Sequence, residues 1–168
     1  MARLPDWVSG VQRLAWLCAL LALLTACGFQ LRGQLPLQQY QAIYIQAERH
    51  SALAAILSHR LRHHQIDILA SQHADSPRLM LQHDSLERRT LSLFPNGQVA
   101  EYELIYQVGY SVQMPGQETQ YFEFELFRDY QDDPNRALAK AQELELMLHE
   151  LREQAAHRIL RQLGRLGA

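Results

Sequence analysis

This 168-residue sequence predicts an α+β fold in which two helices pack on one face of a mostly antiparallel sheet of four or slightly more strands. Two observations lead to this prediction. Between residues 79 and 130, apolar and polar residues alternate, which is typical of antiparallel strands with one apolar and one solvated face. Around residues 51–64 and 134–163, apolar residues instead recur at helical spacing.

The first segment, residues 1–26, has the layout of a lipoprotein signal peptide. Its apolar run at 14–24 follows Arg3 and Arg13 and is about half of the ~20 residues that a membrane-spanning helix needs. Leu-Thr-Ala precedes Cys27, as at sites that a lipoprotein signal peptidase cleaves. We therefore expect cleavage before Cys27, with a diacylglyceryl group on its sulfur and an acyl chain on its new amino group. An ordinary signal peptide beside an incidental cysteine is the alternative.

The cysteine count supports this interpretation. Cys18 lies within the segment to be removed, so Cys27 has no partner for an intramolecular disulfide. Several acyl chains on one residue hold a protein stably on a membrane. Gly28, rather than aspartate, follows the cysteine and favours the outer membrane. We expect residues 27–39 to be a lipidated tether and residues 40–168 to form a single domain.

Each element before the last helix is predicted by its residue pattern. Ser51 is a suitable N-cap for the first helix, and Asn96-Gly97 predicts a type I′ hairpin turn. In chain order, we expect a strand at 40–46, a helix at 51–64, a strand at 66–69, one long or interrupted strand at 79–93, and strands at 102–114 and 122–130 separated by Pro115-Gly116.

A long second helix is predicted from residue 134 to 163. Asp133 suits its N-cap and Pro134 its first position, where the missing amide costs nothing. Gly164 is expected to end the helix. Three arginines, Arg158, Arg161 and Arg165, complement its carbonyl end.

The chemistry-bearing residues give no catalytic constellation. His59 and His63 have a spacing that can bind zinc, but no third ligand accompanies them on that face, so no metal is expected. Asp132 and Asp133 are better explained by capping, and the Tyr102/Tyr106/Tyr110 stripe mainly by the core. The formal net charge of −2 and a single lysine, Lys140, do not indicate nucleic-acid binding.

Three motifs together resemble a known family. They are Cys27-Gly-Phe-Gln-Leu-Arg-Gly33, Asn96-Gly-Gln-Val-Ala-Glu-Tyr102 and Phe127-Arg-Asp-Tyr-Gln-Asp-Asp-Pro-Asn-Arg-Ala-Leu-Ala-Lys140, with a matching continuation at 150–160. In this order and spacing they resemble the LptE family of lipopolysaccharide (LPS)-assembly lipoproteins of Gram-negative bacteria. The resemblance implies a non-enzymatic protein that sits inside the LptD β-barrel, supports the assembly of that barrel, binds LPS and helps insert it into the outer leaflet.

The resemblance also implies an LPS-binding site. In the family, a basic residue just before the Asn-Gly turn and the lysine of Ala-Leu-Ala-Lys are associated with LPS binding. The second matches Lys140, whereas Pro95 stands at the first. Arg88, Arg89 and Arg128 are the candidates to replace that charge. Lys140 could alternatively be a solvated helix residue paired with Glu143 at i,i+3.

Two other functions remain as alternatives at this point. The first is a stand-alone envelope lipoprotein that binds another periplasmic partner, such as the peptidoglycan machinery. The second is an envelope hydrolase, which lacks a recognisable pair of nucleophile and base in the sequence.

Overall fold

The computed structural model describes Trp16 and residues 37–167. The chain divides into two compact units, Met1–Gln34 and Leu35–Ala168, and the strands and helices named below all belong to the second unit. The predicted signal peptide at 1–26, the lipidation site Cys27 and most of the tether at 27–39 lie outside the described residues. In the part that is described, no helix is both long enough and apolar enough to cross a membrane.

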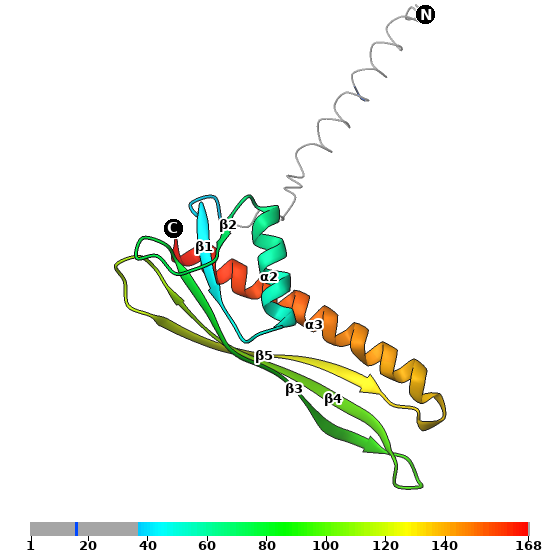
Figure 1. Ribbon diagram of the computed structural model, residues 1–168. Helices are drawn as coiled ribbons and strands as arrows, with labels where there is room; N and C mark the ends of the chain where they lie inside the picture. The colour runs from blue at the N-terminus through cyan, green and yellow to red at the C-terminus, as the bar shows by residue number, and fades with distance from the viewer. Residues whose placement is uncertain (1–15, 17–36, 168) are drawn as a thin grey trace, which may run out of the picture. The chain divides into compact units, whose positions relative to one another are not determined.

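Five strands form one sheet in the order β2-β1-β3-β4-β5. The strands are β1 (Ala42–Gln46), β2 (Asp67–Leu69), β3 (Arg78–Leu93), β4 (Val99–Gln113) and β5 (Gln120–Gln131). Strand β1 runs parallel to β2 and β3, and the β3–β4 and β4–β5 pairs are antiparallel. Helices α2 (Ala52–His63) and α3 (Ala137–Leu166) lie on the same side of this sheet (Figure 1). The predicted α+β fold is therefore confirmed.

Helix α2 begins and ends where the sequence predicted. The Ser51 hydroxyl accepts a hydrogen bond from the Ala54 amide at 3.2 Å, which satisfies one of the free N–H groups of the first turn. Leu53, Leu57 and Leu61 are fully buried and recur at helical spacing, so they fix the face that α2 turns toward the core.

The long strand β3 is continuous, with irregular register between Leu81 and His83 and near Thr90. The predicted type I′ turn after it is wrong. The Gly97 amide donates to the Phe94 carbonyl at 2.9 Å, and only Gly97, not Asn96, has positive φ. The turn centres on Pro95-Asn96 because proline, with φ near −65°, suits the second position of a type I turn.

Helix α3 begins and ends three residues later than predicted. Asp133 does act as a cap, accepting from the Asn135 amide at 3.0 Å, but it caps a 3₁₀ turn, η1 (Pro134–Arg136), that precedes α3. Gly164 does not end the helix; it is buried within it. The chain continues to Leu166, and the side chains of Gln39 and Tyr40 donate to the carbonyls of Gly164 (3.3 Å) and Leu163 (2.8 Å).

The core lies between the sheet and the second half of α3. All buried residues of α3 fall between Leu151 and Gly164, and none lies in Ala137–Glu150. The opposite face of the sheet is mainly acidic, with Ile105, Tyr121 and Phe127 as its large apolar or aromatic residues. By strand alternation and register, this open face carries Glu87, Glu101, Glu103, Glu123, Glu125 and Asp129, with His83 and Arg89 among them.

Candidate functional site

One end of the domain, called the distal end below, exposes large apolar side chains. It consists of the β3–β4 turn, the last residues of β5 and the first half of α3, which lie together opposite β1 and β2 (Figure 1). Its exposed apolar residues are Leu91, Leu93, Phe94, Phe127, Leu138 and Leu146. Such a concentration on a small domain is typical of a surface that contacts a partner or a lipid.

Lys140 lies at the distal end and has three local interactions. Its ammonium nitrogen is 2.6 Å from a Glu143 carboxylate oxygen, which is the i,i+3 pair that the sequence allowed. It also lies 4.7 Å from the centre of the Tyr130 ring, and the Tyr130 hydroxyl donates to the Lys140 carbonyl at 3.0 Å. The Lys140 side chain is only 13% exposed. An anionic ligand must therefore compete with Glu143 for this ammonium group.

A hollow of about 420 Å³ surrounds these groups. It is lined by Leu91, Glu101, Asp129, Tyr130, Gln131, Lys140, Glu143 and Met147. Burial raises the pKa of Tyr130, and Asp132 and Glu143 raise it further, while Lys140 and Arg88 oppose the rise. The hollow, called the lysine hollow below, thus combines one ammonium group, the Glu143 carboxylate that pairs with it, and an apolar wall.

The structure distinguishes the three arginines proposed to replace the basic residue missing at Pro95. Arg89 lies on the open face of the sheet and pairs with Glu103. Arg128 lies on the helix-covered face, 3.3 Å from Glu150. Arg88 shares that face, forms no ion pair within the described residues, and acts on Tyr130 together with Lys140. Of the three, Arg88 is therefore the one without a carboxylate partner in the part of the chain that the structure describes.

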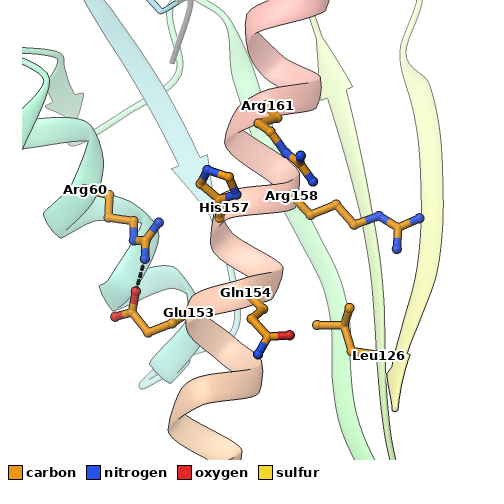
Figure 2. Close-up of a pocket in the computed structure, with 7 residues that line it drawn as sticks. All are labelled: Arg60, Leu126, Glu153, Gln154, His157, Arg158 and Arg161. Carbon is orange, nitrogen blue, oxygen red and sulfur yellow. Dashed lines mark hydrogen bonds and ion pairs between the residues drawn. The ribbon is translucent and has the colours of Figure 1, made fainter. Parts of the chain in front are cut away.

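A second hollow, of about 510 Å³, lies between α2, α3 and β5. Figure 2 shows its lining residues, which are Arg60, Leu126, Glu153, Gln154, His157, Arg158 and Arg161. A smaller hollow of about 220 Å³ shares Arg158 and Arg161 with it and adds Arg165. Together they are called the arginine hollow below. From the sequence, the three α3 arginines are assigned to the end of the helix, and their spacing places them on neighbouring turns. Their proximity to Arg60 could not be predicted, because it depends on how α2 packs against α3.

The arginine hollow has a positive field and an apolar floor. Arg60 pairs with Glu153, whereas the Arg158 guanidinium lies 4.4 Å from the centre of the Phe124 ring. Burial lowers the pKa of His157, and the charges of Arg161 and Arg60 lower it further. These features suit an anion that also has an apolar part.

The described residues show no arrangement for catalysis or metal binding. Within residues 37–167, no three His, Cys, Asp or Glu side chains are grouped to hold a metal ion, and His59 and His63 are both exposed on α2. Tyr106 and Tyr110 of the predicted aromatic stripe are buried in the core, and Tyr102 stacks on Tyr130 with ring centres 6.4 Å apart. The domain is of the binding class, with two charged hollows and an exposed apolar end.

Comparison with known proteins gives the family. The family model described as "LptE: Lipopolysaccharide-assembly" matches residues 40–163. The chain belongs to this family of LPS-assembly lipoproteins, which are non-enzymatic components of LPS assembly. The resemblance identified from the sequence motifs is thereby confirmed.

Individual relatives agree with this assignment. The chain is 35% identical to the LPS-assembly lipoproteins LptE of Yersinia pestis (strain Pestoides F) and Yersinia pseudotuberculosis (serotype O:1b), over 89% of this chain and 74% of each relative. It is similar to the crystal structure of rare lipoprotein B from Shewanella oneidensis, with 44% identity, a TM-score of 0.69, and coverage of 74% of this chain and 95% of that one. A solution structure of lipoprotein B from Nitrosomonas europaea gives 26% identity, a TM-score of 0.65, and coverage of 82% and 91%.

Proposed function

We propose that this protein is held in the outer membrane by the lipid on Cys27, fills the lumen of an LptD-type β-barrel and supports the assembly of that barrel. In this complex it binds LPS and helps insert it into the outer leaflet. The observation that carries the proposal is the distal end, where Lys140 and Arg88 lie beside exposed apolar side chains. The proposal needs no cofactor other than the covalent lipid.

The surface chemistry of the domain suits a barrel lumen. The lumen of a large outer-membrane barrel is polar, and the open face of the sheet presents carboxylates and a few basic groups on a rigid framework. The apolar residues of the distal end add an anchor of the kind that dominates binding energy in protein interfaces.

The barrel contact can be tested by affinity purification from mildly solubilised envelopes. We expect the wild-type protein to recover an LptD-type barrel, and Leu138→Asp with Leu146→Asp to reduce the recovery because both side chains are exposed at the distal end. Ala55→Asp, at an exposed position of α2 that belongs neither to the distal end nor to the open face of the sheet, is the matched control. Recovery of the wild-type protein without any such barrel would refute the proposal.

The LPS contact can be tested at Lys140 with two opposite changes. Lys140→Asp should weaken LPS binding roughly tenfold, the value of about 1.4 kcal/mol expected when a charge-assisted hydrogen bond is lost. Glu143→Gln should strengthen binding, because it releases the ammonium group from its 2.6 Å partner. Arg49→Asp changes the net charge equally at an exposed position between β1 and α2, outside the distal end, and should have little effect. Unchanged affinity of Lys140→Asp at matched salt would exclude the contact.

The anchor is tested separately. Cys27→Ala should abolish incorporation of radiolabelled palmitate and leave the preprotein uncleaved, because the signal peptidase acts on the lipidated cysteine. Persistent palmitate labelling of the Cys27→Ala variant would show that the lipid is attached elsewhere.

A further inference from the structure

The arginine hollow concentrates positive charge that the fold itself does not neutralise. Arg158, Arg161 and Arg165 form no ion pair with any residue in 37–167, whereas Arg60, Arg89, Arg128 and Lys140 each have a carboxylate partner. The three occupy neighbouring positions on one helix, where like charges repel one another. An anion bound among the three would reduce this repulsion.

The two hollows differ in their charge balance. In the lysine hollow the one ammonium group is already paired with the Glu143 carboxylate, and Glu101 and Asp129, whose side chains belong to the open face of the sheet, also border it. The larger part of the arginine hollow has Arg60, Arg158 and Arg161 against the single carboxylate of Glu153, and the smaller part adds Arg165 and Glu123. A multiply charged anion is therefore attracted more strongly to the arginine hollow than to the lysine hollow.

The geometry of the arginine hollow suits phosphate in particular. The Arg158 guanidinium lies over the Phe124 ring, and because it has no ion-pair partner among residues 37–167, its N–H groups can donate in the forked geometry that matches phosphate oxygens. Figure 2 shows the side chains of Arg158 and Arg161 reaching from α3 toward the β5 side of the hollow. Leu126 lies below, and Phe122, Phe124 and Tyr110 line the adjoining part. A phosphate attached to an apolar body would contact both kinds of surface.

We propose that the arginine hollow is a second anion site of this protein, which binds a phosphate group of LPS independently of Lys140. The proposal rests on the function proposed above, because LPS is taken as the ligand. Arg158 and Arg161 make the main contacts, Arg165 extends the site toward the end of α3, and the apolar floor favours an amphiphile over free phosphate.

The test compares binding of LPS, LPS stripped of its phosphates, and inorganic phosphate to the whole domain. The variant Arg158→Gln/Arg161→Gln should lose at least tenfold in affinity for LPS and show a weaker salt dependence, with no change for the stripped LPS. The matched control Arg49→Gln/Arg62→Gln removes two exposed arginines that do not line the hollow, and should bind as the wild type does. Since Arg158 and Arg161 are exposed, both variants should unfold at about the wild-type temperature.

A spectroscopic readout reports on the hollow directly. The pKa of His157, followed by NMR titration, should rise when LPS binds, because a phosphate offsets the cationic field of Arg161 and Arg60 and the Glu153 carboxylate remains in place. Inorganic phosphate at the same concentration should produce a smaller rise. If inorganic phosphate bound with the same affinity as LPS and raised the pKa of His157 equally, the inference that the ligand is an amphiphile would be overturned.

The outcomes separate the two proposals. If the wild type binds LPS, Lys140→Asp weakens binding and Arg158→Gln/Arg161→Gln binds within twofold of the wild type, the second anion site is refuted and the proposed function stands. If the wild type binds no LPS, the LPS-binding part of the proposed function fails, and the second site fails with it. A selective loss in the arginine variant, with the control unchanged, supports the site.

Discussion

The two halves of α3 belong to one continuous helix but have different surroundings. From Leu151 to Gly164 the helix buries seven residues against the sheet and α2, whereas from Ala137 to Glu150 it buries none. In the first half Leu138 is 77% exposed, while in the second Leu160 is fully buried. Both halves have apolar residues at helical spacing, so the periodicity that predicts the helix does not tell which half is packed.

The difference shows that the domain has a stabilising part and an interacting part. Burial of the second half stabilises the fold, and the helix then carries its first half outward beside the β3–β4 turn (Figure 1). Apolar side chains in the first half contribute little to the stability of the free domain, because they remain in water. They are available to a partner.

The largest expected effect is a contrast between two leucines of α3. Leu160→Ala should lower the free energy of unfolding by about 2–5 kcal/mol, because it leaves a cavity in the core. Leu146→Ala, at a side chain that is 59% exposed, should change it by no more than about 0.5 kcal/mol. Urea denaturation of both variants measures this contrast.

A loss of similar size in the two leucine variants would contradict the division of α3 into a packed and an interacting half. Recovery of the barrel partner gives the complementary measurement. Leu146→Ala should reduce it, while any reduction by Leu160→Ala should follow the fraction of unfolded protein.

Much of this fold could be predicted because its signals are local. Ser51 and the alternation along β4 act on their immediate neighbours as predicted, and Asp133 caps the chain where predicted, although it caps the 3₁₀ turn η1 rather than α3 itself. The end of α3 could not be predicted in this way. Gly164 is a typical stop signal, but in this fold it is buried within the helix and the Gln39 amide donates to its carbonyl. That contact joins residues 125 positions apart.

The candidate site was predictable to a smaller extent. Lys140 is identified as a candidate LPS-binding residue from the resemblance of motifs, and its ion pair with Glu143 is predicted from helical spacing. The proximity of Arg88 to Tyr130 and of Arg60 to His157 depends on how strands and helices pack, which no local pattern contains. The β3–β4 turn shows that even local signals can conflict. Asn96-Gly97 favours a turn centred on those two residues, whereas Pro95 favours one centred on Pro95-Asn96, and the second turn is the one that forms.

The second expected effect concerns the hydrogen bond that ties the packed end of α3 to the start of the domain. Tyr40→Phe removes the 2.8 Å bond to the Leu163 carbonyl and should cost about 1 kcal/mol of unfolding free energy. Tyr121→Phe, at a side chain that is 69% exposed, is the matched control and should be neutral. Thermal unfolding of the two variants checks this, and an unchanged Tyr40→Phe midpoint would show that water satisfies the carbonyl equally well.

The smallest expected effect is a pH dependence of stability from His157. Burial, together with Arg161 and Arg60, lowers its pKa below the usual 6.5, so the unfolded chain binds its proton more readily than the folded one. Stability should therefore decrease as the pH falls from about 6.5 to the lowered pKa of His157, and change no further below it. His157→Gln should remove this part of the pH dependence, as measured by unfolding midpoints between about pH 5 and pH 7.5. Arg161→Gln should move the pKa of His157 upward in an NMR titration. A pKa that stayed in place would show that Arg161 does not act on His157, which would also weaken the case for a strong cationic field in the arginine hollow.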